Sequence, residues 1–191
     1  MQIPESSPPH DTPDDEAARH QRLALAALGK FREVLGSVKR HVGWVEEQCG
    51  LSGTKLWALH EIQKRPGLKV TELAQAMSIH QSTASNLVDK LIKRGLIRRD
   101  RSSDDQRVVN LTITDQGEKL LAAAPHPPMG VLPDALVNLP EPVLRELDAN
   151  LGALIETMKV RDAESALEPL SDAFTASSRH LDVPLTQKKP K

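Results

Sequence analysis

Apolar residues recur three and four positions apart along most of the chain, which is the spacing of one face of an α-helix. The pattern predicts helices over five ranges, which are 17–48, 54–64, 71–77, 81–94 and 140–160. Residues that end helices follow three of these ranges, at Gly50, at Pro66-Gly67 and at Gly95. The chain is therefore predicted to be mainly α-helical.

The pattern changes after Gly95, where helical spacing gives way to short apolar runs. Residues 96–99 and 108–113 are predicted to be strands, and the polar segment between them is predicted to be the tip of a hairpin. Thr114 then stands where the N-cap of a further helix is expected, with acidic residues in the first turn. That helix should end near Pro125, because three prolines follow within four residues.

The helix predicted over residues 81–94 has two faces of different chemistry. The apolar face consists of Ala84, Leu87, Val88, Leu91 and Ile92. The other face begins with short polar side chains that can hydrogen-bond to base edges or phosphates in a major groove, namely Ser82, Thr83, Ser85 and Asn86. Lys90, Lys93 and Arg94 follow. In an isolated helix such basic residues more often only complement the helix dipole.

The neighbouring elements favour a DNA-binding role for this helix. A short helix, a tight turn, an amphipathic helix and a basic two-stranded hairpin are, in that order, typical of a winged helix-turn-helix. Arg101 and Arg107 flank the hairpin tip, where guanidinium groups can enter a minor groove. Asp104 and Asp105 would repel phosphate, so we expect one of them to pair with a neighbouring arginine and fix the shape of the hairpin.

Charge supports an anion-binding patch at this place. The formal net charge is −1, yet residues 84–107 hold seven basic residues against four acidic ones. Residues 1–16, by contrast, hold five acidic residues and no Lys or Arg. A local positive excess of this kind is typical of a surface that meets phosphate.

Composition narrows the class of protein and its expected location. The single cysteine, Cys49, excludes an intramolecular disulfide framework, and no apolar run approaches the length of about 20 residues that a membrane span needs. The first residues lack the basic and apolar regions of a signal peptide. We therefore expect a soluble cytoplasmic protein with no membrane partner. Because no catalytic or phosphate-binding motif is present, we expect neither an enzyme nor a cofactor.

Residues 51–117 resemble the multiple antibiotic resistance regulator (MarR) family, above all in LVDKLIKRGLI, DDQR and LTITDQG. The resemblance implies a homodimer that binds a pseudo-palindromic operator and represses nearby genes until a small aromatic ligand or an oxidant releases it. It makes residues 81–94 the recognition helix, Arg107 the wing-tip arginine and Asp105 its acidic partner. Many members begin that helix with Ser-Pro, where this chain has His80 and Gln81, which we include among the expected DNA contacts.

The predicted organisation has five parts. Residues 1–16 form a flexible acidic arm, 17–50 an N-terminal dimerisation helix, 51–117 the winged helix-turn-helix, 118–160 C-terminal dimerisation helices and 161–191 a weakly structured tail. The apolar stripes of the first and last long helices exceed what one small domain can cover. We therefore expect them to be buried against a second copy of the chain.

Four side chains are candidates for a ligand pocket: His41, Trp44, Trp57 and His60. Core packing is the alternative role of the two tryptophans. The histidines show no metal-ligand spacing, so we predict no metal site. Cys49 would act as an oxidant sensor only as a reactive thiolate, and by the resemblance such thiols lie nearer the start of the first helix.

Together these features predict a mainly α-helical winged helix-turn-helix protein with a small β-hairpin wing and terminal dimerisation helices. Its predicted function is sequence-specific regulation of transcription, as a repressor released by a small aromatic ligand. Two alternatives stay open. One is a winged-helix module that binds a protein partner and no DNA, and the other is a regulator that senses oxidants through Cys49.

Overall fold

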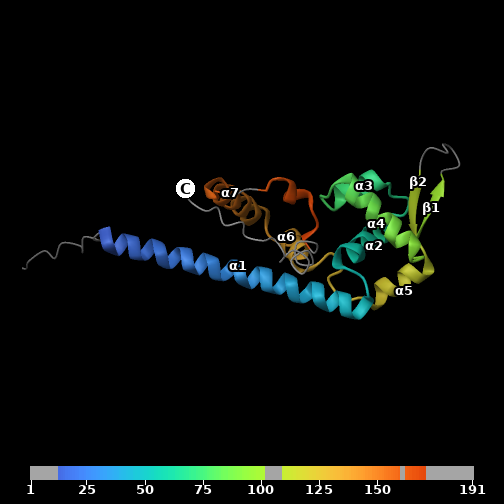
Figure 1. Ribbon diagram of the computed structural model, residues 1–191, viewed down its shortest axis with the longest axis horizontal. Coiled ribbons are helices and arrows are strands. Elements are labelled where there is room, and N and C mark those ends of the chain that lie inside the picture. Colours follow the sequence, from blue (N-terminus) through green and yellow to red (C-terminus); the bar gives the residue numbers. More distant parts are fainter. Residues whose placement is uncertain (1–12, 102–108, 160–161, 171–191) are drawn as a thin grey trace, which may run out of the picture. The chain divides into compact units, whose positions relative to one another are not determined.

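The computed structural model describes residues 13–101, 109–159 and 162–170 (Figure 1). The chain divides into two compact units, Met1–Ser37 and Val38–Lys191, and helix α1 (Pro13–Cys49) contributes to both. Within the described residues, no helix is both long enough and apolar enough to cross a membrane.

The first unit contains the N-terminal part of α1. The helix begins at Pro13, four residues before the predicted start, so Pro13 to Glu16 are helical although we predicted them to belong to the flexible arm. Proline suits the first position of a helix, and the acidic residues Asp14, Asp15 and Glu16 suit its first turn. The large apolar side chains of this part are exposed, and they include Leu23, Leu25, Leu28, Phe31 and Leu35.

The second unit is built around α2 (Gly53–Lys64) (Figure 1). This helix contacts α3 (Val70–Ala76), α4 (Gln81–Lys93), strand β2 (Val109–Ile113) and α5 (Asp115–Ala123). Leu56, Leu59 and Ile62 of α2 are fully buried in this core. The helices predicted over residues 54–64, 71–77 and 81–94 are confirmed, each to within one residue at both ends.

The turn between α3 and α4 is a compact helix end. The N–H of Ser78 donates to the carbonyl of Gln75 (3.2 Å), and the N–H of Ile79 donates to that of Ala74 (3.0 Å). This pair of bonds is the Schellman motif, which requires a left-handed residue, and Ser78 has a φ of 50°. Gly95 ends α4 in the same way, with a φ of 69° that glycine adopts without strain.

The predicted hairpin is confirmed. Strands β1 (Ile97–Arg101) and β2 (Val109–Ile113) pair antiparallel, with Ile97 opposite Ile113 and Arg101 opposite Val109. Leu68, after α2, forms an isolated bridge to Leu111, which attaches the hairpin to the helical core. The hairpin tip, residues 102–108, lies outside the described residues.

Helix α5 (Asp115–Ala123) begins as predicted. The hydroxyl of Thr114 accepts a hydrogen bond from the N–H of Gly117 (3.2 Å), so Thr114 is its N-cap. Gly117 is buried, and a Cβ added there would lie 2.2 Å from the carbonyl oxygen of Leu96. Only glycine therefore allows α5 to approach the start of β1 so closely.

The region after α5 contains one helix that the periodicity did not predict, α6 (Val131–Val137). Gly130 precedes it, and Pro133 falls in its first turn, where no backbone donor is needed. Helix α7 (Glu141–Thr157) confirms the predicted helix over 140–160. Its apolar side chains are largely exposed, among them Val143, Leu144, Leu154 and Ile155. In the predicted tail, a short 3-10 helix η1 spans Glu164–Leu167.

Candidate nucleic-acid interface

Helix α4 buries one face and exposes the other, as its sequence predicts. Ala84, Leu87, Val88 and Leu91 are buried against the core. On the opposite face His80, Gln81, Ser82, Asn86, Lys90 and Lys93 are exposed, and Thr83 and Ser85 are half-buried. Ser82, Asn86, Asp89 and Lys93 are spaced by four, three and four residues, so they share one outward row. This row is the solvent-exposed side of α4.

An ion pair modifies the charge of that row. Nη2 of Arg99, in β1, lies 2.9 Å from Oδ1 of Asp89. The pair offsets the charge of the one acidic residue in the row and joins α4 to β1. Sequence reasoning assigned no role to either residue, because the pairing depends on which face of β1 Arg99 occupies.

The base of the wing carries a second exposed ion pair. Nε of Arg98 donates to the carboxylate of Asp100 (3.0 Å). A hydrogen bond from the hydroxyl of Thr112, and then the charge of Arg98, lower the pKa of Asp100. Arg101 ends β1, and nothing is described of its side chain; the predicted tip residues Asp104, Asp105 and Arg107 lie outside the described residues.

Arg94, at the end of α4, reaches another helix. Its Nη1 donates to the carbonyl oxygen of Gly50 at 2.6 Å, directly after the last residue of α1. Carbonyl groups at a helix C-terminus carry partial negative charge, so the guanidinium is well placed there. Arg94 thus connects the end of α4 to the end of α1.

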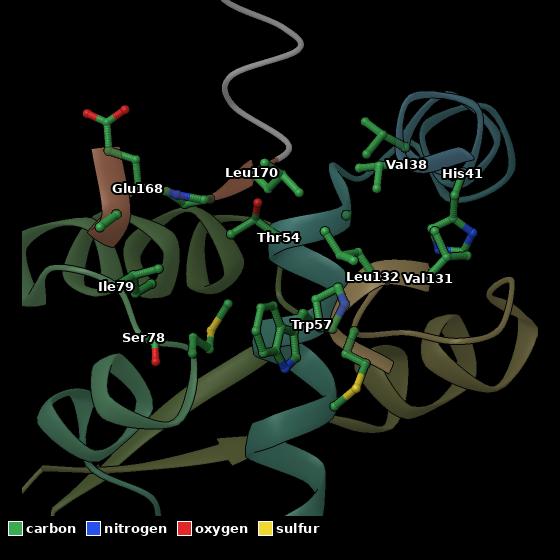
Figure 2. Close-up of a pocket in the computed structure, with 18 residues that line it drawn as sticks. Val38, His41, Thr54, Trp57, Ser78, Ile79, Val131, Leu132, Glu168 and Leu170 are labelled. Atoms are coloured by element: carbon green, nitrogen blue, oxygen red, sulfur yellow. The ribbon is translucent and has the colours of Figure 1, made fainter. Parts of the chain in front are cut away.

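A cavity of about 210 Å³ lies beside the turn that precedes α4 (Figure 2). Its wall includes Val38 of α1, Thr54 of α2, Ile79 of the turn, Leu132 of α6 and Leu170 near the end of the described chain. The backbone N–H of His80 also donates to the carbonyl of Leu167 at 3.3 Å. The segment around η1 therefore lines the cavity and contacts the N-cap residue of α4.

Two of the four predicted pocket residues line this cavity, His41 and Trp57. Trp44 and His60 are not among its lining residues. Trp44 is about half exposed, and its ring stands edge-on to that of His41, with 6.0 Å between centroids. Burial lowers the pKa of His41, and a hydrogen bond with the backbone of Pro127 acts in the opposite direction.

The indole of Trp57 is held by a buried carboxylate. Its Nε1 donates to Oε1 of Glu61 (3.2 Å), and Nη2 of Arg65 donates to Oε2 of the same residue (2.8 Å). Glu61 is 7% exposed. Both oxygens of a buried acid are thus paired, which is the condition for its being tolerated inside a protein.

Two further sequence predictions concern Cys49 as a candidate oxidant sensor and the binding of a metal ion. Cys49 is half-buried, and burial raises the pKa of its thiol. A raised pKa lowers the thiolate fraction, which is the reactive form. Within the described part of the chain, no group of three or more His, Cys, Asp or Glu side chains could hold a metal ion.

The model of the MarR family matches residues 51–109. The chain is 33% identical over 72 residues to the HTH-type transcriptional repressor MdtR of Bacillus subtilis, covering 38% of this chain and 46% of MdtR. It therefore spans about half the length of that relative. It is 30% identical over 95 residues to the transcriptional regulator HosA of Escherichia coli O157:H7, covering 49% of this chain and 70% of HosA.

Among solved structures, the S. aureus MepR–DNA complex matches with a TM-score of 0.47 and 23% identity, over 66% of this chain and 92% of that one. Both sequence relatives are named as regulators of transcription, which is the class that the sequence analysis predicted.

Proposed function

Since the chain belongs to the MarR family, we propose that it regulates transcription by binding double-stranded DNA through α4 and the hairpin wing. The observation that carries the proposal is the outward row of α4, where Ser82 and Asn86 are exposed ahead of Lys93. Short polar side chains can approach base edges, and lysine can contact phosphate. A regulator that binds genomic DNA must be in the compartment that contains the genome, which in a bacterial cell is the cytoplasm. The proposed DNA binding therefore supports the predicted cytoplasmic location.

A second copy of the chain would complete the proposed DNA-binding assembly. Large apolar side chains are exposed along α1 and α7, and monomeric proteins rarely expose large apolar patches. A symmetric dimer would bury them and present two copies of α4 to one duplex. The two helices would then lie about 34 Å apart, one DNA turn, and read inverted half-sites.

We further propose that the protein is a repressor released by a small aromatic ligand. The name of MdtR, a repressor, supports the direction of regulation. The cavity supports ligand control, because Ser78 and Ile79 line it and stand directly before the recognition helix. A ligand that prefers one position of α4 shifts the population of operator-competent dimers. A preference of about 100-fold, or about 2.7 kcal/mol, is an adequate switch.

The test is a salt titration of DNA binding with a matched lysine control. An operator is first selected from a random duplex pool, and its affinity is then measured by fluorescence anisotropy between 50 and 300 mM KCl. With about six phosphate contacts, log K should fall against log salt with a slope near −5. Lys93→Ala removes one expected contact per protomer, so the slope of the dimer should become shallower by about 1.8.

The control is Lys64→Ala, since Lys64 is exposed in the last turn of α2 and lies outside the proposed interface. Its slope should equal that of the unchanged protein. Two results would contradict DNA binding through α4: no duplex bound at 50 mM salt, or equal slopes for both lysine variants. The first result would favour the winged-helix module that binds a protein partner.

A further inference from the structure

The charge of the cavity wall restricts what can bind in it. Among the described residues that line the cavity, none is Lys or Arg, and the only acidic one is Glu168. Glu168 is exposed, and Figure 2 shows its carboxylate at the rim, directed away from Trp57 and Leu132. The interior of the wall therefore offers no full charge to a ligand of either sign.

The polar groups of the wall are few and neutral. Thr54 and Ser78 each contribute a hydroxyl, and His41 contributes an imidazole whose pKa burial lowers from its ordinary value of 6.5, which favours the uncharged form at neutral pH. The indole N–H of Trp57 already donates to Glu61. Such a wall can form hydrogen bonds with a ligand, but its described residues include no Lys or Arg that would pair with an anion.

The size of the cavity fits a small aromatic molecule. An apolar cavity of roughly 150 Å³ holds benzene, and this one measures about 210 Å³. The side chains of Val38, Met77, Ile79 and Leu132 supply apolar contact, and Trp57 supplies an aromatic face. One ring with a small polar substituent fills this space.

We propose that the cavity binds an uncharged, single-ring aromatic molecule with one small hydrogen-bonding substituent, and that it rejects aromatic carboxylates. The inference rests on the proposed ligand control and specifies the chemical class of the ligand. Its physical basis is that a carboxylate entering this wall loses its water and meets no cation, which is a large cost for a buried charge.

Three planar molecules of almost equal shape test the proposal: benzamide, which is neutral, benzamidinium, which is cationic, and benzoate, which is anionic. Binding to the full chain is measured by quenching of Trp57 fluorescence in the Trp44→Phe variant, where Trp57 is the only tryptophan. Ligand-observed NMR with the unchanged protein gives an independent dissociation constant. We expect benzamide to bind roughly tenfold more tightly than benzoate, with benzamidinium weaker than benzamide.

A charge added to the wall should invert this preference. Leu132→Lys places an ammonium at the half-buried wall of α6, and it should raise benzoate affinity above that of benzamide. The control is Val137→Lys, which adds the same charge to the same helix at an exposed position that does not line the cavity, and it should leave the ranking unchanged.

The inference is overturned if benzoate binds the unchanged protein as tightly as benzamide, if none of the three molecules binds, or if both lysine variants behave alike. These measurements use no DNA. Failure of the salt titration would therefore reject the proposed function while leaving the ranking of ligands intact, and the reverse also holds.

Discussion

Removing Arg99 should weaken DNA binding by exposing Asp89 rather than by unfolding the protein. In the folded chain the guanidinium lies 2.9 Å from the Asp89 carboxylate, which stands in the outward row of α4 between Asn86 and Lys93. In Arg99→Ala that carboxylate keeps its place without a counter-charge. Each half of the proposed dimer would then present an additional unpaired negative charge to the phosphates.

The magnitudes separate the effect on stability from the effect on binding. The two side chains are 44% and 52% exposed, so solvent screens their attraction and its loss should cost at most about 1 kcal/mol of folding free energy. Across water, a carboxylate about 6 Å from a phosphate is repelled by roughly 0.7 kcal/mol. Two copies in the proposed dimer would give about 1.4 kcal/mol, a tenfold loss of affinity.

The assay compares three variants at one salt concentration by fluorescence anisotropy, with thermal melting as the measure of folding. Arg99→Ala should bind about tenfold more weakly and melt within a few degrees of the unchanged protein. Asp89→Asn should bind at least as well as the unchanged protein. The double variant should return to within about twofold of it, because no carboxylate remains to repel phosphate. A double variant as weak as Arg99→Ala would refute this reasoning, since Arg99 would then act on DNA directly.

Three other substitutions test the fold and the rival switch. Gly117→Ala forces a Cβ to within 2.2 Å of the Leu96 carbonyl oxygen. Calorimetry should therefore show a free energy of unfolding lower by about 2–3 kcal/mol and a melting temperature lower by about 5–10 °C. An unchanged melting temperature would contradict the close approach. Because burial lowers the pKa of His41 from its ordinary 6.5, the unfolded chain takes up that proton first. The contribution of neutral His41 to the free energy of unfolding is therefore complete above pH 6.5 and is lost as the pH falls below 6.5. Melting curves from pH 8 to 5 should show this loss of stability, and the loss should be smaller in His41→Gln. Operator binding should survive peroxide equally in the unchanged protein and in Cys49→Ser, and release that occurs only when Cys49 is present would restore the oxidant-sensing alternative.

The parts of the fold that depend on local signals could be predicted from the sequence. The amphipathic spacing of α4 and the N-cap at Thr114 are properties of a few neighbouring residues, and the structure confirms both. Helix α6 has only seven residues and includes Pro133, so it carries too little periodicity to be recognised. The start of α1 at Pro13 was missed because a run of Pro, Ser and Asp has the composition of a flexible arm.

The candidate sites depend on contacts between distant residues, which a linear pattern does not contain. The sequence identified His41 and Trp57 as pocket residues by their chemistry, but it could not show that Trp44 and His60 lie outside the wall of the cavity. The same limit hid the partner of Asp89, which lies ten residues away on a strand.

The bond between Trp57 and Glu61 has an evolutionary consequence. Exchange of the indole for an aliphatic side chain would leave one oxygen of a buried carboxylate without its donor, so this wall of the cavity resists single mutations. No buried acid depends on a hydrogen bond from Met77 or Leu132, so each of these two residues can be substituted singly. Paralogues with new ligand preferences are therefore expected to diverge first at these two positions while the tryptophan and its acid are inherited together.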